Sequence, residues 1–110
     1  MQNKIDLNQG AWLVHEPHWI NEEEAHKFFE VLYKELSWVE RSIIAKGKVV
    51  QQPRLMTWAG ELPYLYSGQV LDPQPTHPLL KELETRVSDF CELSFNHVVA
   101  NLYRDGHDRV

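Results

Sequence analysis

The sequence predicts an α+β domain in which two helices pack against a mainly antiparallel sheet. Two observations support the helices and the strands: two segments repeat apolar side chains at helical spacing, and several shorter segments are rich in β-branched and aromatic residues. A third observation is that Gly and Pro clusters separate these segments. With 110 residues, the chain is expected to form a single domain over 1–110.

The two helices have recognisable starts. Asn21 is predicted to open the first helix, because Glu24 follows at the spacing of a capping box. Its apolar positions are Ala25, Phe28, Phe29, Leu32 and Leu36. The second helix is predicted to start near 76–78, since proline is tolerated in a first turn, and to end near Glu92. Its apolar face consists of Leu79, Leu80, Leu83, Val87 and Phe90.

The strands are predicted from the segments that remain. Segments 38–45 and 49–52 read as a hairpin around Lys46-Gly47-Lys48. Segments 54–59 and 64–70 are predicted to form a second antiparallel pair. The connector 72–75 carries two prolines and cannot be the interior of a strand, and 95–104 is the last predicted strand.

The charge of the chain is unevenly distributed. A formal net charge of −5 argues against a general polyanion binder. The charged residues between positions 41 and 60 are nevertheless all basic: Arg41, Lys46, Lys48 and Arg54. Two interpretations stay open for this stretch, contact with phosphate groups or a solvated hairpin rim.

Cysteine content and hydropathy indicate in which cellular compartment the protein is expected. Cys91 is the only cysteine, which excludes an internal disulfide and a thiolate metal cluster. It falls on the apolar stripe of the second predicted helix, so we expect it to be buried. No apolar run has the length of a signal peptide or a membrane span, and we therefore expect a cytoplasmic protein without membrane contact.

Two polar side chains of the last predicted strand stand on one surface. Side chains alternate between the faces of a strand, which places Asn101 and Tyr103 together, about 7 Å apart. Both can donate hydrogen bonds, as a small dicarboxylate would require. From the residues alone, two rim residues of a sheet would give the same pattern.

Two longer motifs carry a resemblance to a known family. The stretches PRLMTWAGELPYLYSG and FNHVVANLYRDGHDRV, in this order, resemble the AlkB family of Fe(II)- and 2-oxoglutarate-dependent dioxygenases, in particular its branch acting on alkylated DNA and RNA. The first fifty residues fit that family more loosely. The resemblance implies the N-terminal portion of a double-stranded β-helix, or jelly roll. It also implies oxidative dealkylation of N-methylated bases such as 1-methyladenine and 3-methylcytosine, an alkylation-repair activity.

The resemblance assigns cofactor residues on the last strand. Asn101 matches the asparagine that binds the 2-oxoglutarate carboxylate next to the keto group, and Tyr103 matches the tyrosine that binds the far carboxylate. Leu102 lies between them in the same cofactor segment, although its side chain should point the other way. Val99 matches an apolar residue of the substrate pocket wall.

The resemblance also assigns residues that contact nucleic acid. Arg54 matches an arginine near the lesion pocket. The positions that match contacts with the substrate base are Trp38, Tyr64, Leu65 and Tyr66. Aromatic rings stack well on a flipped, cationic methylated base, although Trp38 and Tyr66 could instead serve core packing. Ala59 departs from the family, where a second aromatic residue often follows the tryptophan.

The iron ligands of the family are not expected within 1–110. Iron there binds two histidines and one carboxylate, the first two ligands coming from a His-x-Asp motif shortly after the Asn-x-Tyr. His107-Asp108 is no substitute, because adjacent side chains point apart. The coding sequence is thus expected to continue, within about six codons, into His-x-Asp, whose i and i+2 side chains project from one face of a strand.

Two other functions stay open beside the dioxygenase. The chain could be a non-catalytic module of degenerate AlkB-like fold that binds nucleic acid or a protein. It could also be a structural interaction module whose apolar faces pair between chains. An unfinished barrel would expose edge strands, through which we expect self-association.

Overall fold

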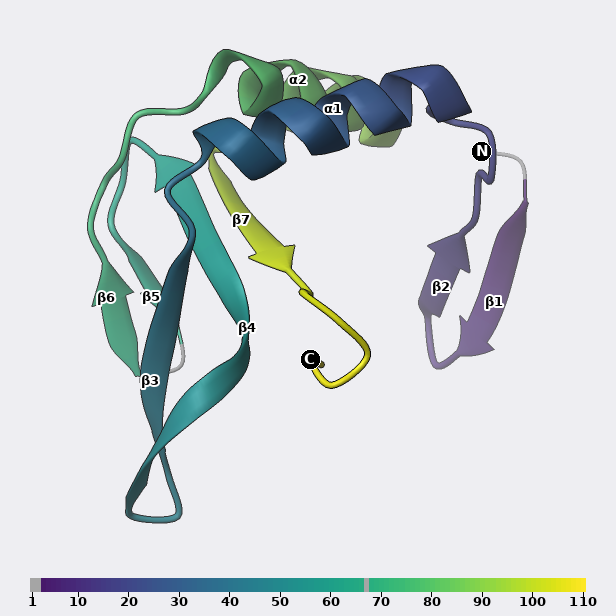
Figure 1. Cartoon of the computed structure of the whole chain (residues 1–110). Helices are drawn as coiled ribbons and strands as arrows, with labels where there is room; N and C mark the ends of the chain where they lie inside the picture. The colour runs from purple at the N-terminus through teal and green to yellow at the C-terminus, as the bar shows by residue number, and fades with distance from the viewer. Residues whose placement is uncertain (1–2, 67) are drawn as a thin grey trace. The chain divides into compact units, whose positions relative to one another are not determined.

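The computed structural model describes residues 3–66 and 68–110, without the side chain of Tyr66. The chain divides into two compact units, Met1–Lys34 and Glu35–Val110, whose elements are labelled in Figure 1. In the described residues, two helices and antiparallel sheets confirm the α+β class. The sheets are not closed, so a jelly roll is not confirmed, and the single domain over 1–110 stays a prediction.

The first unit begins with a hairpin that sequence analysis missed. Strands β1 (Lys4–Asn8) and β2 (Ala11–Val14) pair antiparallel. Asn8, Gln9 and Gly10 turn the chain with φ values of 73°, 54° and 81°, a left-handed region that Asn and Gly enter most easily. The Asn-Gln-Gly sequence between two short alternating segments is the signal that could have revealed it.

Helix α1 (Glu22–Glu35) starts as predicted. The Asn21 Oδ1 atom accepts a hydrogen bond of 2.8 Å from the Glu24 backbone amide, which confirms the cap. Phe28 is buried, whereas Phe29 is 58% exposed and stacks on Tyr33 with ring centroids 5.8 Å apart. The buried stripe of α1 is therefore narrower than its apolar spacing suggests.

The main sheet of the second unit has three strands in the order β3-β4-β7, all antiparallel. They are β3 (Val39–Ala45), β4 (Lys48–Gly60) and β7 (His97–Leu102). The predicted hairpin between β3 and β4 is confirmed, with Ala45 opposite Lys48. Lys46 and Gly47 have φ values of 51° and 76°, and two consecutive positive φ values suit the twist of a tight hairpin.

The pairing predicted for residues 54–59 with 64–70 is wrong. β4 is one strand of 13 residues that includes Pro53, and its second half pairs with β7. Pro53 is tolerated because the register shifts there: Glu40 faces Leu55 while Ser42 faces Gln51, so three residues of β4 lie against one of β3. A residue without an N–H fits at such an interruption.

Residues 64–71 form their own hairpin, β5 (Tyr64–Tyr66) and β6 (Gln69–Leu71). After it, Gly60 and Gln74 exchange two backbone hydrogen bonds of 2.9 and 3.0 Å. This isolated bridge ties the proline-containing connector to the end of β4.

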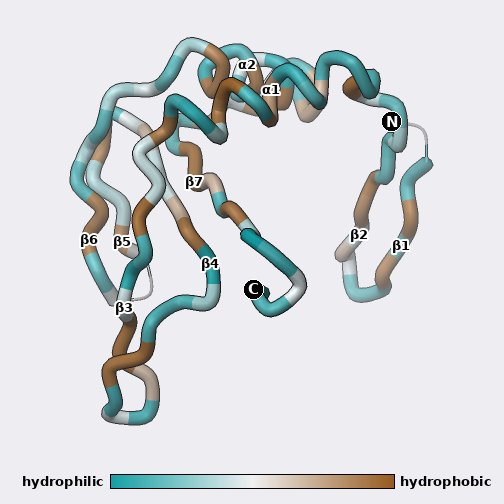
Figure 2. Tube along the Cα trace, in the orientation of Figure 1, coloured by the Kyte–Doolittle hydropathy of each residue, from teal (hydrophilic) through white to brown (hydrophobic). Residues whose placement is uncertain are grey.

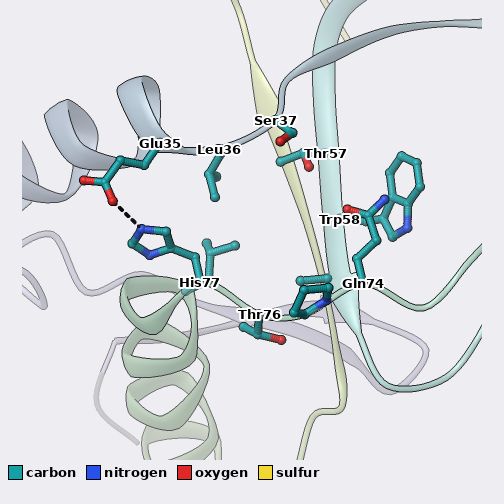
Figure 3. Close-up of a pocket in the computed structure, with 11 residues that line it drawn as sticks. Glu35, Leu36, Ser37, Thr57, Trp58, Gln74, Thr76 and His77 are labelled. Atoms are coloured by element: carbon teal, nitrogen blue, oxygen red, sulfur yellow. Dashed lines mark hydrogen bonds and ion pairs between the residues drawn. The ribbon is translucent and has the colours of Figure 1, made fainter.

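Helix α2 (Pro78–Cys91) confirms the second predicted helix. Its N-cap is His77, whose Nδ1 accepts a 3.0 Å hydrogen bond from the Leu79 amide. Because Nδ1 accepts, the neutral ring carries its proton on Nε2, which lies 3.0 Å from Glu35 Oε1 (Figure 3). The helix ends at Glu92 in the left-handed conformation, φ 56°. The prediction that Cys91 is buried is wrong, because its side chain at the helix end is only half-buried.

The buried apolar residues of the second unit come from three elements: Met56, Ala59, Leu71 and Leu80. Beside them lies a pocket of about 290 Å³, bounded by Glu35 and His77 on one side and by Thr57 and Trp58 on the other (Figure 3). Neither helix in the described part of the chain has the length and apolar character needed to cross a membrane.

Candidate functional site

The register of β4 and β7 decides which side chains share a face. Met56 lies opposite Asn101, Trp58 opposite Val99, and Gly60 opposite His97. Residues directly opposite each other project to the same side. One face of the sheet, here called the Asn101 face, therefore carries Arg54, Met56, Trp58, His97, Val99 and Asn101. Val99 and Asn101 share this face as the alternation predicted.

Arg54 and Asn101 are in direct contact. The Arg54 Nε donates to Asn101 Oδ1 at 3.3 Å, and Nη1 donates to the Arg109 carbonyl at 3.4 Å. Arg54 is only 7% exposed, whereas Asn101 is exposed. The structure thus joins two residues that the resemblance assigned to different ligands, one to the lesion and one to the cofactor.

The other cofactor candidates lie at the end of the strand. β7 ends at Leu102, so the strand is shorter than the predicted 95–104. Leu102 faces Leu55 on the opposite side of the sheet from Asn101, as expected. Tyr103 follows the strand and is 43% exposed, so its position is set by the following loop and not by strand alternation.

The loop after Tyr103 is held by an ion pair. The Arg104 Nε donates to Asp108 Oδ2 at 2.7 Å, and Nη2 donates to Oδ1 at 3.1 Å. These hydrogen bonds lower the pKa of Asp108 and raise the pKa of Arg104. The Arg109 amide then donates to the Pro53 carbonyl at 2.9 Å, which anchors the segment on β4.

Sequence reasoning missed Trp58 and its contact with Arg41, which was noted only as part of the basic stretch. The Arg41 guanidinium lies 5.0 Å from the Trp58 ring centroid, a cation–π distance. Arg41 Nη2 also donates to Gln69 Oε1, and Gln69 Nε2 donates to the Ser42 carbonyl at 2.7 Å. These contacts connect β3, β4 and β6. The alternation that relates Arg54 to Trp58 on β4 could have identified the tryptophan.

A second aromatic contact lies at the other end of the Asn101 face. Tyr64 stacks on His97 with ring centroids 4.6 Å apart and an interplanar angle of 22°. The His97 Nε2 atom is buried and has no hydrogen-bond partner among the described residues. Tyr64 itself is 44% exposed, which leaves part of its ring accessible.

The remaining base-contact candidates do not belong to β4 or β7, the two strands that form the Asn101 face. Leu65 is 69% exposed and pairs with Val70 on the β5–β6 hairpin. Trp38 is half-buried immediately before β3, and its amide donates to the Leu36 carbonyl at 3.1 Å. The side chain of Tyr66 lies outside the described residues, so its predicted role stays a prediction.

The residues present fit a carboxylate ligand. A guanidinium has only donors, so Arg54 faces the oxygen of the Asn101 amide and leaves Nδ2 as a donor. Tyr103, which is 43% exposed, carries a hydroxyl that is a second possible donor. For iron, the described residues contain no group of three His, Cys, Asp or Glu side chains that could hold a metal ion.

Comparison with known proteins shows what this chain is similar to. No family model matches it. Over 95 residues, 86% of the chain, it is 39% identical to the Alpha-ketoglutarate-dependent dioxygenase alkB homolog 3 of Bos taurus and 38% identical to that of Homo sapiens. Over 92 residues, 79% of the chain, it is 33% identical to the human DNA oxidative demethylase ALKBH2. The resemblance to the AlkB family is confirmed. The chain spans about a third of the length of these AlkB relatives.

Proposed function

We propose that this chain provides the nucleobase-binding face and part of the 2-oxoglutarate site of an AlkB-like dioxygenase, which dealkylates N-methylated bases in DNA or RNA. The observation that carries the proposal is the Asn101 face. It combines an amide donor, held by Arg54, with Trp58 and the Tyr64–His97 stack on one surface. The names of the similar proteins include a 2-oxoglutarate-dependent dioxygenase and a DNA demethylase, which supports this class.

The proposed cofactor role is limited to what this chain carries. Iron and 2-oxoglutarate, when bound, would supply the oxidising chemistry together with O₂. Asn101 Nδ2 and the Tyr103 hydroxyl donate hydrogen bonds to the two carboxylates, and Val99 shapes the wall beside Asn101. In this proposal the iron ligands lie beyond residues 1–110.

The proposed nucleic-acid role uses the aromatic residues and the β3–β4 hairpin. Figure 2 shows apolar segments on both arms of this hairpin, where Ile44 and Val49 face each other at 76% and 75% exposure. Two exposed lysines lie at its tip, Lys46 in the turn and Lys48 at the start of β4. We propose that they contact phosphate while Trp58 and Tyr64 contact bases, so that the basic stretch is more than a solvated rim.

The experiment that tests the proposal compares ligand dependences in the intact protein that contains this chain. Succinate release is measured with Fe(II), ascorbate and an oligonucleotide carrying 1-methyladenine or 3-methylcytosine. Tyr103→Phe removes a hydrogen bond to a carboxylate, so the apparent KM for 2-oxoglutarate should rise by about tenfold or more. Tyr64→Ala should instead raise the KM for the oligonucleotide, since a stacking contact contributes about 1–3 kcal/mol.

Two results would count against the proposal. If Tyr103→Phe leaves the 2-oxoglutarate dependence unchanged, Tyr103 lies outside the cofactor site. If the intact protein binds the oligonucleotide but releases no succinate, the non-catalytic binding module becomes the better description. The 110-residue chain alone is expected to release none, and turnover that a chelator abolishes would contradict that expectation.

A further inference from the structure

We propose that Arg54 is a positioning residue: it orients the Asn101 amide so that Nδ2 donates to a carboxylate of 2-oxoglutarate, and it does not itself contact the alkylated base. This inference rests on the proposed function, since it concerns the same cofactor site. It also reassigns Arg54, which the family resemblance placed near the lesion pocket.

The orientation follows from the chemistry of the two groups. Arginine carries donors and no acceptor, so its Nε can approach only the oxygen of an amide. The contact between Arg54 Nε and Asn101 Oδ1 at 3.3 Å therefore fixes which end of the amide faces Arg54. Nδ2 then lies on the side away from Arg54, and among the described residues it has no hydrogen-bond partner. An exposed donor with a fixed orientation is what an incoming carboxylate requires.

The burial of Arg54 shows that it is held in place. Arg54 as a whole is 7% exposed, and a second nitrogen, Nη1, donates to the Arg109 carbonyl at 3.4 Å. The same Arg109 residue donates its amide to Pro53, the neighbour of Arg54, at 2.9 Å. A buried guanidinium is costly without such acceptors. If the Arg54 side chain turned toward a base, it would lose both of these hydrogen bonds. Asn101 is exposed and can reach a ligand without such a change.

The charge of Arg54 also acts through Asn101. An amide oxygen that accepts from a cationic donor is polarised, which makes the N–H groups of the same amide stronger donors. A buried positive charge behind the amide attracts a dicarboxylate as well. Arg54 therefore contributes to cofactor binding without touching the cofactor.

The test measures the Asn101 amide and cofactor affinity separately. The sample is the ¹⁵N-labelled intact protein that contains this chain. In it, the side-chain NH₂ signals of Asn101 are assigned by their loss in Asn101→Ala. They are then recorded in wild type and in Arg54→Met, and 2-oxoglutarate is titrated into wild type, both single variants and the double variant. Lys27→Met is the charge-matched control, because Lys27 is an exposed lysine of α1.

The expected result has three parts. The Asn101 NH₂ signals move toward the shifts of a solvated amide in Arg54→Met, while Lys27→Met leaves them unchanged. The affinity for 2-oxoglutarate falls by about tenfold in Arg54→Met, because one oriented charge-assisted hydrogen bond is lost. In the Asn101→Ala background, the same Arg54 substitution has little further effect, since a residue that acts through Asn101 needs that side chain.

Other outcomes overturn the inference in distinguishable ways. If Asn101→Ala weakens binding but Arg54→Met changes neither the signals nor the affinity, Arg54 does not position Asn101, and the proposed function stands. If Asn101→Ala leaves 2-oxoglutarate binding unchanged, the cofactor assignment fails and the inference fails with it. Additive losses in the double variant would show that Arg54 acts independently of Asn101.

Arg54→Lys keeps the inference testable if Arg54→Met does not fold. Lysine retains the buried charge, but a single ammonium does not reproduce the fork that reaches both Asn101 Oδ1 and the Arg109 carbonyl. We expect a retained thermal midpoint with several-fold weaker 2-oxoglutarate binding and shifted Asn101 signals. Wild-type affinity with unshifted signals in this variant would overturn the inference.

Discussion

The two halves of β4 lie in opposite environments within one continuous strand. The first four residues, 48–51, are exposed, and Val49 is 75% exposed. From Gln52 to Gly60 every residue is buried or half-buried, and Met56 is 0% exposed. The border coincides with Pro53 and the interrupted register against β3. Only the second half also pairs with β7.

The comparison shows that neighbouring strands decide burial more than side-chain type does. Val49 and Val50 are as apolar as the residues of the second half, yet they project from a two-stranded arm. Leu55 to Gly60 have β7 on their other edge and contribute Met56 and Ala59 to the core. A single strand thus serves as both a core element and an exposed arm.

Met56→Ala should produce the largest difference between the halves. Met56 is fully buried, and truncating a buried methionine costs about 2–5 kcal/mol of unfolding free energy. Val49→Ala in the exposed half should change it by less than about 0.5 kcal/mol. Urea unfolding of the two variants measures both values. Similar losses would mean that the exposed arm packs as tightly as the core.

Gly60→Ala tests the close packing at the C-terminal end of β4. A Cβ there would lie 2.8 Å from His97 Cδ2 and 2.9 Å from the Asn96 carbonyl oxygen, so the backbone immediately before β7 would have to shift. We expect a loss of about 1–3 kcal/mol in unfolding free energy. Gly106→Ala is the matched control, because a Cβ there meets nothing within 4 Å. Equal stability of the two variants would show that β4 and β7 separate easily.

Lys48→Gln tests the exposed half as a nucleic-acid contact. If Lys48 contacts one phosphate, the slope of log K against log salt for a single-stranded oligonucleotide should decrease by about 0.7 in magnitude. The measurement is fluorescence anisotropy over a salt series, with Lys27→Gln on α1 as the control. A slope equal to wild type would identify the arm as a solvated rim.

Asp108→Asn should give the smallest effect. Asp108 lies in the loop that is anchored on the second half of β4 through the Arg109–Pro53 hydrogen bond. The hydrogen bond from Arg104 holds the pKa of Asp108 below its ordinary value of 3.8, so its contribution to stability exists above that value. This contribution is lost as the pH falls through the lowered pKa. Thermal midpoints of the wild type and the variant should therefore differ near neutral pH and converge in acid. Curves that coincide at every pH would show that the pair contributes nothing, and a constant offset between them would show that the difference does not come from the titration of Asp108.

The sequence predicts the features that depend on neighbours along the chain. The Asn21–Glu24 cap and the Lys46-Gly47 turn are short-range signals, and the structure confirms both. The shared face of Val99 and Asn101 follows from strand alternation. Pairing between strands that are distant in sequence is not encoded locally, which explains the wrong partner for the second half of β4.

The candidate site divides in the same way. The resemblance supplied Asn101 and Arg54 as separate assignments, but their hydrogen bond depends on the register between β4 and β7. Trp58 could have been identified from alternation along β4, whereas its contact with Arg41 also depends on how β3 lies against β4. Tyr103 lies beyond the end of β7, where alternation no longer fixes the direction of a side chain.

The cap of α2 has a consequence for local opening of the fold. One ring nitrogen of His77 accepts from the Leu79 amide, and the other lies 3.0 Å from Glu35, so a single imidazole secures two segments of the chain. Asparagine could cap the helix, but its shorter side chain would not reach Glu35 as well. Rotation of this one ring releases both segments together, and hydrogen exchange at the Leu79 amide therefore reports on the attachment of Glu35.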